Sequence, residues 1–400
     1  MQGKATFVVG LQYGDEGKGK IVDNLAETHD VVVRGNGGAN AGHTIVLKNG
    51  EALALHQIPS GIAYPNTLNI IGNGCFVDPV SLNEEINDAI AKGIAIGPDN
   101  LAISKSAHLV LPLHKQKDAQ RESGAKSQGT TKAGIAYVAA DKALREGIRA
   151  EIIEQESTNT LAEIAGQEFA EASEKLKPFL CDSVELIQSQ IKNKSILVEG
   201  AQAFGLDINH GKYPYTTSSD TTVSGLLSGT GLNYKQVGRV IGVAKATPSK
   251  VGGGAFVTEI KDQKIADQTR GEKGNVDAEF GATTGRVRGV GYLDLVALKR
   301  AVQVNGVDEI ALTKFDCLNR HGQTTKLAVA YEMDGNKITS PPSSDHELSR
   351  CKPIYQEFST WEDNTSPEAE KYLKFVEKYL GIPVTMVGVG PGRNQLIIRN

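Results

Sequence analysis

The chain has 400 residues, 40% of them hydrophobic and 22% charged, so it is long enough to bury a large core. Its 43 Lys and Arg against 47 Asp and Glu give a formal net charge of −4, which lacks the basic surplus typical of nucleic-acid-binding proteins. Its four scattered cysteines show no C-x-x-C spacing, and we find no signal peptide and no membrane-length apolar run. We therefore expect a cytoplasmic protein without nucleic-acid or membrane partners.

Short apolar runs bounded by glycine or polar residues predict buried strands. They lie at 7–9, 31–33, 68–71, 196–198, 240–243, 310–312 and 384–387. Near-continuous apolar strands are typical of a parallel sheet whose two faces are covered by helices. The sequence therefore predicts an α/β fold with a large, mainly parallel twisted sheet flanked by helices.

Three helices are predicted with boundaries. Apolar residues at helical spacing predict one over 161–176, which Pro178 then breaks. A second is expected to run from an Asp294 cap to about Asn305, and a third to lie within 366–381, between a Ser-Pro start and a Gly stop.

The chain shows no obvious linker. No Pro- or Ser-rich tract, charge block or repeat divides it, so we expect residues 1–400 to form a single domain with long ligand-binding loops. The 44 glycines cluster in short loops where backbone can approach a ligand closely. We expect the glycine-punctuated, polar stretch 118–150 to be an ordered ligand loop.

The first glycine loop has the strand, phosphate loop and helix order of nucleotide-binding proteins. Residues 14–20 nearly match G-x-x-x-x-G-K, but Ile21 replaces the hydroxyl residue that holds Mg²⁺ in that motif. Asp15 and Glu16 lie inside the loop, where phosphates would repel a carboxylate unless it holds a metal or works on a proton. The loop by itself predicts a phosphate or nucleotide site. The alternative is a glycine-rich turn with solvated charges.

The loop sequence GDEGKGK (14–20), followed by GGANAGHT (37–44), closely resembles the adenylosuccinate synthetase family. In the family's order, the resemblance continues through IPSGI (58–62), EGAQ (199–202), HGKYPYTTSSDTT (210–222), FGATTGRVRG (280–289), TKFD (313–316) and GPGR (390–393). These blocks span essentially the whole chain. The resemblance implies the family's fold and a GTP-hydrolysing ligase of AMP biosynthesis. This ligase joins IMP and L-aspartate into adenylosuccinate through 6-phosphoryl-IMP.

The resemblance also implies a catalytic set. Asp15 is expected to remove the purine N1 proton, and His43 to stabilise charge on the 6-oxygen and the γ-phosphoryl group. Lys18 is expected to face the transferring phosphoryl group, and Gln202 to contact the purine. Mg²⁺ is expected on the Asp15 carboxylate and the Gly42 backbone carbonyl, which replace the missing hydroxyl.

Three substrate sites follow from the same resemblance. The IMP residues are Asn40, Thr131, Gln202, Thr217 and Arg145, the last contributed by the second subunit of a homodimer. The L-aspartate residues are Thr283, Thr284 and Arg286, since arginine matches a carboxylate in a bidentate way. The GTP residues are Gly14, Glu16, Gly17, Lys18, Gly19, Lys20, Gly42, His43, Thr44, Arg288, Lys314, Asp316, Gly390 and Pro391. The structural alternatives are a snorkelling Lys20, a solvated loop Gln202 and a solvated helix face at Arg145.

The chain also departs from the family pattern. Ala133 stands where a basic residue linked to the amino-acid substrate is usual, Asp220 replaces a common Asn, Gly388 replaces a nucleotide-contacting Ser, and Gly289 replaces an arginine. These departures leave open 2-aminoadenylosuccinate synthesis from dGMP with ATP or GTP, the reaction of a viral branch. That branch replaces the loop aspartate, whereas this chain keeps Asp15. A more remote alternative is a nucleotide-binding switch without ligase chemistry, which would need no second or third substrate site.

Overall fold

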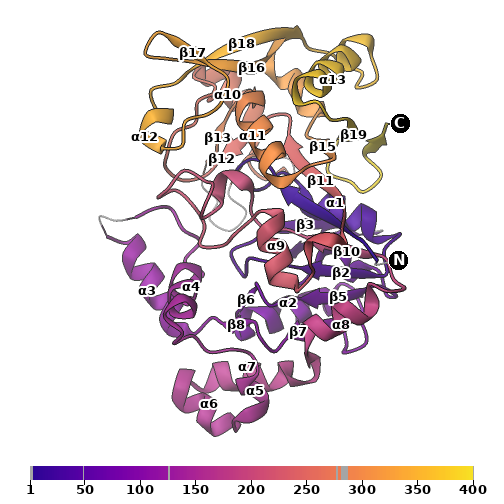
Figure 1. The fold of residues 1–400 in the computed structure, drawn as a ribbon, viewed down its shortest axis with the longest axis vertical. Helices are drawn as coiled ribbons and strands as arrows, with labels where there is room; N and C mark the ends of the chain where they lie inside the picture. The colour runs from indigo at the N-terminus through magenta and orange to yellow at the C-terminus, as the bar shows by residue number, and fades with distance from the viewer. Residues whose placement is uncertain (1–2, 48, 125–126, 276–277, 281–286, 400) are drawn as a thin grey trace. The chain divides into compact units, whose positions relative to one another are not determined.

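The computed structural model describes residues 3–47, 49–124, 127–275, 278–280 and 287–399 (Figure 1). The chain divides into two compact units, each built from several stretches. Unit 1 comprises Met1–Val8, Gly19–Gln202 and Thr217–Arg239, and unit 2 comprises Val9–Lys18, Ala203–Thr216 and Val240–Asn400. The single domain expected from the sequence remains a prediction.

Unit 1 is built on parallel strands hydrogen-bonded in the order β1, β10, β2, β5, β7, β9. Their bounds are β1 (Ala5–Gly10), β2 (Val31–Arg34), β5 (Leu68–Ile71), β7 (Leu101–Ser104), β9 (Leu180–Cys181) and β10 (Ile196–Glu199). Four of them, β2, β5, β7 and β10, are buried almost throughout, which explains their apolar sequences. The register pairs Glu199 with Arg34, so these two charged residues end adjacent strands.

Helices and short strand pairs complete unit 1. The helices are α1 (Lys18–Ala26), α2 (Pro79–Ala91), α3 (Pro112–Glu122), α4 (Ile135–Leu144), α5 (Ile152–Gln155), α6 (Thr158–Ala165), α7 (Gln167–Leu176), α8 (Ser183–Gln190) and α9 (Val223–Thr230), with 3₁₀ turns η1 (Ser60–Ala63), η2 (Lys177–Phe179) and η4 (Tyr234–Gln236). The strand pairs are antiparallel β3 (His43–Val46) with β4 (Ala52–Leu55), and parallel β6 (Phe76–Val77) with β8 (His108–Leu109). A buried aliphatic cluster including Ile45, Leu82 and Ile103 forms the core.

Two expectations for this unit were wrong. The helix predicted over 161–176 is two helices, because Gly166, at φ 90° and ψ 161°, separates α6 from α7. The apolar spacing continues across this break and therefore concealed it. The stretch 118–150, expected to be a loop, contains the end of α3 and all of α4. Gly134 in this stretch marks a helix end, since it is the left-handed N-cap of α4.

Unit 2 contains β11 (Val237–Lys245), β15 (Glu309–Thr313) and β19 (Val384–Gly388) in parallel, with β20 (Leu396–Ile398) antiparallel to β19. A second sheet holds β14 (Leu293–Asp294), β16 (Thr324–Met333), β17 (Asn336–Ile338) and β18 (Lys352–Ser359), and β12 (Ser249–Lys250) pairs with β13 (Gly289–Val290). The helices are α10 (Gln263–Arg270), α11 (Leu295–Asn305), α12 (Asp345–Leu348) and α13 (Pro367–Leu380), with η3 (Phe204–Leu206) and η5 (Asp316–His321). Helix α11 packs on β16 and α13 (Figure 1).

The other predicted elements are confirmed. Each predicted apolar run lies in a strand, and the two units together confirm the α/β class with its mainly parallel strands and flanking helices. Asp294 caps α11 by accepting from the backbone N–H groups of Val296 and Ala297, and Gly306 ends that helix in the left-handed region. Helix α13 occupies 367–380, between its predicted start and stop.

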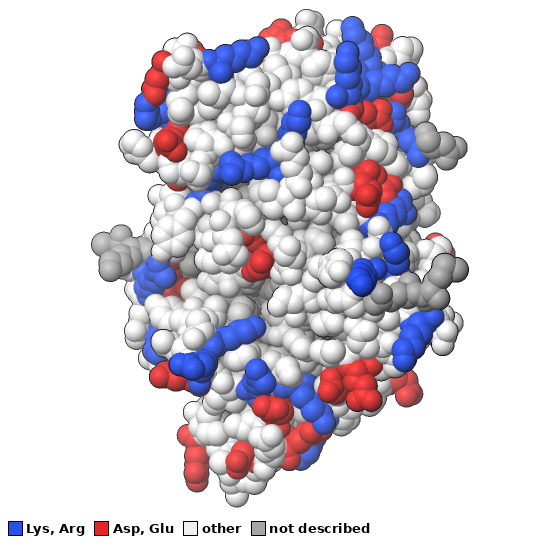
Figure 2. Space-filling model, in the orientation of Figure 1, with Lys and Arg blue, Asp and Glu red and all other residues white. Residues whose placement is uncertain are grey.

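The length of the helices and the distribution of surface charge can be compared with what membrane or nucleic-acid binding would need. No helix among the described residues is both long and apolar enough to cross a membrane. On the face drawn in Figure 2, acidic and basic side chains are interspersed. This face therefore presents no broad basic patch of the kind that binds a nucleic-acid backbone.

Candidate functional site

The predicted site residues form one group in each compact unit. All five IMP residues lie in unit 1, as do Gly19, Lys20, Gly42, His43 and Thr44. The remaining GTP residues lie in unit 2, together with Asp15. The predicted aspartate residues Thr283, Thr284 and Arg286 lie outside the described residues.

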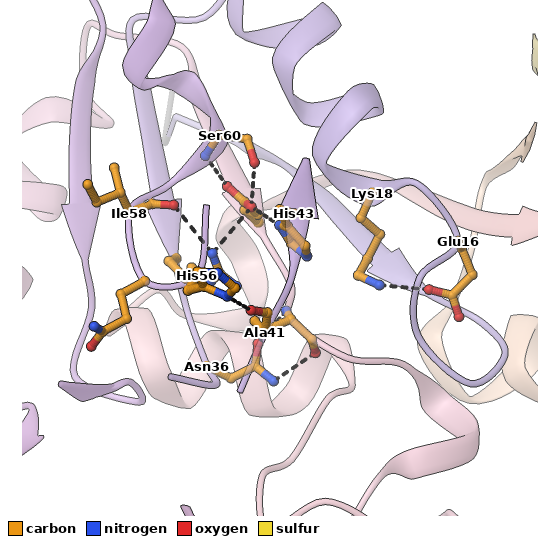
Figure 3. Close-up of polar contacts among 12 residues, drawn as sticks. Glu16, Lys18, Asn36, Ala41, His43, His56, Ile58 and Ser60 are labelled. Carbon is orange, nitrogen blue, oxygen red and sulfur yellow. Dashed lines mark hydrogen bonds and ion pairs between the residues drawn. The ribbon is translucent and has the colours of Figure 1, made fainter. Parts of the chain in front are cut away.

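In unit 1, the carboxylate of Glu199 holds the buried imidazole of His43 (Figure 3). His43 begins β3 and Glu199 ends β10, and the ring Nδ1 donates to Glu199 Oε1. The same carboxylate accepts from the Ser60 backbone N–H at 2.7 Å and from its hydroxyl at 2.8 Å, with the Arg34 guanidinium at 3.7 Å. Because Nδ1 is committed to Glu199, proton exchange with a substrate falls to Nε2.

The charge state of Glu199 follows from these partners. Burial raises its pKa, but His43, Arg34 and Ser60 outweigh that effect and lower the pKa to about 2. The carboxylate is therefore ionised at neutral pH and can accept the Nδ1 proton of His43. EGAQ (199–202) is one of the blocks that resemble the family, but no role was predicted for Glu199, although a glutamate ending a buried strand was the available signal.

Close packing also fixes the surroundings of His43. A Cβ added to Gly19 would lie 2.9 Å from the Cβ of His43, so only glycine lets α1 approach β3 this closely. The segment before His43 is anchored by His56, whose Nδ1 donates to the Ala41 carbonyl at 2.6 Å (Figure 3). Gly42 between them is exposed, and an added Cβ there would meet nothing within 4 Å.

Gln202, three residues after Glu199, is held in an unfavourable state. Its backbone lies in the left-handed region at φ 57°, and both polar atoms of its amide are buried with no hydrogen-bond partner among the described residues. Burying an unpaired polar group costs about 1–3 kcal/mol, and strain of this kind is concentrated at ligand sites. Asn40 has a similarly buried amide oxygen, again with no partner in the part of the chain that the structure describes. Two predicted IMP residues thus carry unused hydrogen-bonding capacity.

The position of Gln202 depends on two neighbours. Gly37 lies against it at φ 82°, and an added Cβ would be 2.7 Å from the Ala201 Cβ and 3.1 Å from Gln202 Oε1. The amide of buried Asn36 accepts from Ala201 N at 2.8 Å and donates to the Ala201 and Asp220 carbonyls, each at 3.2 Å. Asn36, which the sequence analysis missed, therefore fixes the backbone before Gln202.

The other IMP residues are less enclosed. Thr217 is half-buried and Thr131 is exposed. The loop of Thr131 is tied to α3 by Asp118, which accepts from the Thr130 hydroxyl at 2.8 Å and from Gly134 N at 3.0 Å. Arg145 is exposed at the C-cap of α4, with φ 65°, rather than on a helix face.

In unit 2, the phosphate loop is organised around Glu16. Its buried carboxylate accepts from Gln12 N at 3.1 Å and from Gly14 N at 2.9 Å. It also accepts from the Lys18 ammonium at 2.7 Å (Figure 3). The Thr313 hydroxyl donates to the Glu16 carbonyl at 2.6 Å and ties the loop to β15. We expected a loop carboxylate to hold a metal or move a proton. Glu16 instead satisfies the amide donors of its own loop.

Asp15 points elsewhere. It has φ 56°, its side chain is 40% exposed, and its carboxylate pairs with Arg288 Nη2 at 2.5 Å. A partly exposed carboxylate is a hard oxygen ligand of the kind Mg²⁺ prefers, so Asp15 fits the proposed metal. The exposed Gly42 backbone is likewise open to approach.

The predicted guanine residues surround the end of β15. Lys314 has φ 53°, and Asp316 begins η5. The Phe315 N–H donates to the Gly388 carbonyl at 3.0 Å, which joins this segment to the end of β19. A Cβ at Gly388 would lie 3.2 Å from Thr313 Cα, so the glycine that departs from the family pattern suits this tight contact.

The loop after β19 closes on itself. The Gln395 side chain accepts from Gly392 N at 2.7 Å, and a Cβ at Gly390, with φ 149°, would lie 2.4 Å from the same side chain. Pro391 between them is exposed. These contacts define the shape of the loop that the sequence predicts to pack at the guanine base.

Comparison with known proteins identifies the family. The family profile described as adenylosuccinate synthetase matches residues 7–166 and 159–397, nearly the whole chain. The chain belongs to the adenylosuccinate synthetase family. The predicted family and its ligase class are thereby confirmed.

Individual members of the family agree with this. The adenylosuccinate synthetase of Caldicellulosiruptor bescii is 42% identical over 98% of this chain and 99% of that protein, and that of Chlorobium phaeobacteroides is 39% identical over 99% and 97%. The fully ligated adenylosuccinate synthetase of Plasmodium falciparum superposes with a TM-score of 0.91 at 34% identity, over all of both chains.

A viral structure is similar at a lower level. The succinoaminodeoxyadenylate synthetase of cyanophage S-2L, bound to dGMP and dATP as an energy donor, gives a TM-score of 0.68 at 22% identity, over 100% of this chain and 96% of that one. This likeness shows the shared fold alone. The dGMP alternative is therefore not favoured over the adenylosuccinate synthetase reaction.

Proposed function

We propose that the protein condenses IMP with L-aspartate while converting GTP to GDP and phosphate, and so makes adenylosuccinate. The observation that carries this proposal is the buried amide of Gln202, which lies on a left-handed backbone and has no hydrogen-bond partner within the described ranges of the chain. An amide has both a donor and an acceptor, which suits the paired donor and acceptor on the edge of a hypoxanthine ring. Family membership supports the same substrate set.

The reaction has to activate a poor leaving group. Asp15 takes the N1 proton of IMP, and the purine 6-oxygen then attacks the γ-phosphorus of GTP, releasing GDP. The amine of aspartate adds at C6, phosphate leaves with the former 6-oxygen, and the amine loses a proton. The product keeps the new C–N bond, so atoms and charge balance.

His43 acts on the oxygen side of this transfer. The ionised Glu199 keeps a proton on Nδ1 and favours the imidazolium form, so Nε2 can donate to the 6-oxygen as charge develops there. Lys18 and the backbone N–H groups of the loop neutralise the charge of the nucleotide phosphates. For this, these donors, which now contact Glu16, have to donate to the phosphates as well. These roles are supported by the buried position of His43 and Lys18.

The metal has a narrow role in this proposal. Asp15 and the Gly42 carbonyl would hold Mg²⁺, which when bound neutralises negative charge on the transferring phosphoryl group. Thr283, Thr284 and Arg286 are proposed to bind aspartate, and Asp316 to accept from guanine. The exposed Arg145 is proposed to reach a neighbouring subunit of a homodimer, consistent with its position at the end of α4.

A substrate panel tests the proposal. Purified protein is mixed with IMP or dGMP and GTP or ATP, with and without L-aspartate, and phosphate release is followed with product identified by mass. We expect aspartate-dependent phosphate release with IMP and GTP, and adenylosuccinate as product. Aspartate-dependent phosphate release with dGMP but not with IMP would favour the viral reaction. The lack of aspartate-dependent phosphate release in every mixture would contradict ligase activity.

A further inference from the structure

Glu279 is a buried carboxylate to which neither the sequence nor the proposed mechanism assigns a role. Its side chain is 1% exposed, and it receives Lys245 at 3.2 Å, Arg288 Nη1 at 2.9 Å and the Lys314 ammonium, together with the Ser249 hydroxyl at 2.6 Å. Burial raises its pKa, but Lys245 and Lys314 outweigh burial and hold the pKa far below its ordinary value. Glu279 is therefore a buried anion at neutral pH.

Two of the three cations have a place in the proposed nucleotide site. Lys314 is predicted to contact guanine and Arg288 the phosphates. Arg288 is also shared, since Nη1 meets Glu279 while Nη2 meets Asp15. The buried Glu279 carboxylate thus contacts both Lys314 and Arg288. The Arg288 guanidinium also links it to Asp15, the proposed general base.

Geometry makes this arrangement specific. Lys314 lies on a left-handed backbone, a conformation that costs a non-glycine residue free energy and persists only when its surroundings enforce it. A buried carboxylate can accept at both oxygens, and here Oε1 receives Lys314 while Oε2 receives Arg288. A neutral amide in its place offers one accepting oxygen, so it cannot receive the two cations at separate oxygens.

We propose that Glu279 is a positioning residue for the nucleotide, because its carboxylate sets the separation of Lys314 and Arg288 before GTP arrives. It does not touch the reacting atoms. This inference rests on the proposed function, since Lys314 and Arg288 are nucleotide residues only there. The competing explanation is structural, namely that Glu279 only balances buried positive charge.

Lys245 separates these two explanations. It is 1% exposed, contacts Glu279 and Ser249, and has no proposed substrate. Replacing it by methionine removes one buried positive charge and leaves Lys314 and Arg288 unchanged. If Glu279 only balances charge, adding Lys245→Met to Glu279→Gln should restore both the unfolding temperature and the KM for GTP. If Glu279 positions Lys314 and Arg288, the repair should restore stability alone.

The experiment compares wild type, Glu279→Gln, Glu279→Gln/Lys245→Met and Glu357→Gln. Glu357 provides the matched control, since it is 58% exposed in unit 2 and pairs with Lys326 at 2.9 Å. Thermal unfolding is measured together with KM for GTP and KM for IMP. We expect the double variant to unfold near the wild-type temperature with a KM for GTP raised at least ten-fold, while KM for IMP changes less than two-fold. A wild-type KM for GTP in the double variant would overturn the inference.

Two further arms keep the test decisive. If neither glutamine variant folds, Glu279→Asp retains the charge on a side chain one methylene shorter, and a wild-type KM for GTP in that variant overturns the inference. If wild type makes no adenylosuccinate, the proposed function has failed by itself. GTP dissociation constants from calorimetry then decide, and equal constants for wild type and the double variant count against a positioning role.

Discussion

The interaction of Glu199 with His43 makes a prediction about both stability and catalysis. Glu199→Gln keeps the size of the side chain and removes its charge. Lowering the pKa of a fully buried carboxyl from 4.5 to about 2 corresponds to about 3 kcal/mol, since each pH unit is worth about 1.4 kcal/mol. Loss of one partner from a buried ion pair costs about 3–5 kcal/mol, which agrees. We expect the variant to lose about 3 kcal/mol of unfolding free energy at pH 7.

The pH dependence gives a sharper signature. The folded pKa of Glu199 lies below its ordinary value, so its contribution to stability is complete above about pH 5 and is lost as the pH falls toward 2. The difference between wild type and Glu199→Gln should therefore narrow steadily below pH 5. Glu85→Gln is the matched control, because burial raises the pKa of Glu85, which accepts from the backbone N–H groups of His56, Gln57 and Ile58. It should show no such narrowing.

The assay is guanidinium unfolding followed by circular dichroism between pH 3 and 7. Far-ultraviolet dichroism is preferred because the single tryptophan, Trp361, lies in unit 2, whereas Glu199 lies in unit 1. We also expect kcat to fall about 100-fold, since a mispositioned general acid forfeits about 10²–10⁴ in rate. A stability difference below 1 kcal/mol at pH 7, or one that is constant from pH 5 to 3, would refute the reasoning.

Three other predictions follow from the two groups of residues. Gln202→Leu should raise KM for IMP by about 10–100-fold yet leave the unfolding temperature equal or higher, because it removes a buried unpaired amide; a lower unfolding temperature with normal KM would contradict this. Asp316→Asn should weaken GTP use and relax discrimination against ATP, measured as the ratio of kcat/KM values; an unchanged ratio would place the guanine contact elsewhere. Mixing Arg145→Leu with Asp15→Ala subunits should partly restore activity if Arg145 completes a neighbouring site, and failure to restore it counts against a shared site.

The fold could largely be predicted from the sequence because its signals are local. Buried parallel strands appear in the sequence as apolar runs. The cap of α11 is visible as Asp294, and the ends of α13 are visible as its Ser-Pro start and Gly stop. The break at Gly166 was missed because helical periodicity carries on across it.

In the candidate site, the motif residues could be predicted from the sequence, whereas the residues that position them could not. Motif residues such as His43 could be named from the sequence, since a resemblance supplies them directly. The residues that hold them, Glu199, Asn36 and Glu279, depend on contacts with residues 9 to 184 positions away in the chain. No periodicity or spacing encodes such contacts, and a buried glutamate reads in a sequence like any other charged residue.

The carboxylate of Glu16 has a consequence for the enzyme between turnovers. A loop whose backbone N–H groups lie beside a lysine binds polyanions. Without an anion, these positively polarised donors would repel one another. Here the Glu16 carboxylate supplies a counter-ion from the chain itself, and it holds the N–H groups of the loop and the Lys18 ammonium together. A phosphate group that binds this loop therefore meets donors already held in place and has to displace the Glu16 carboxylate from them.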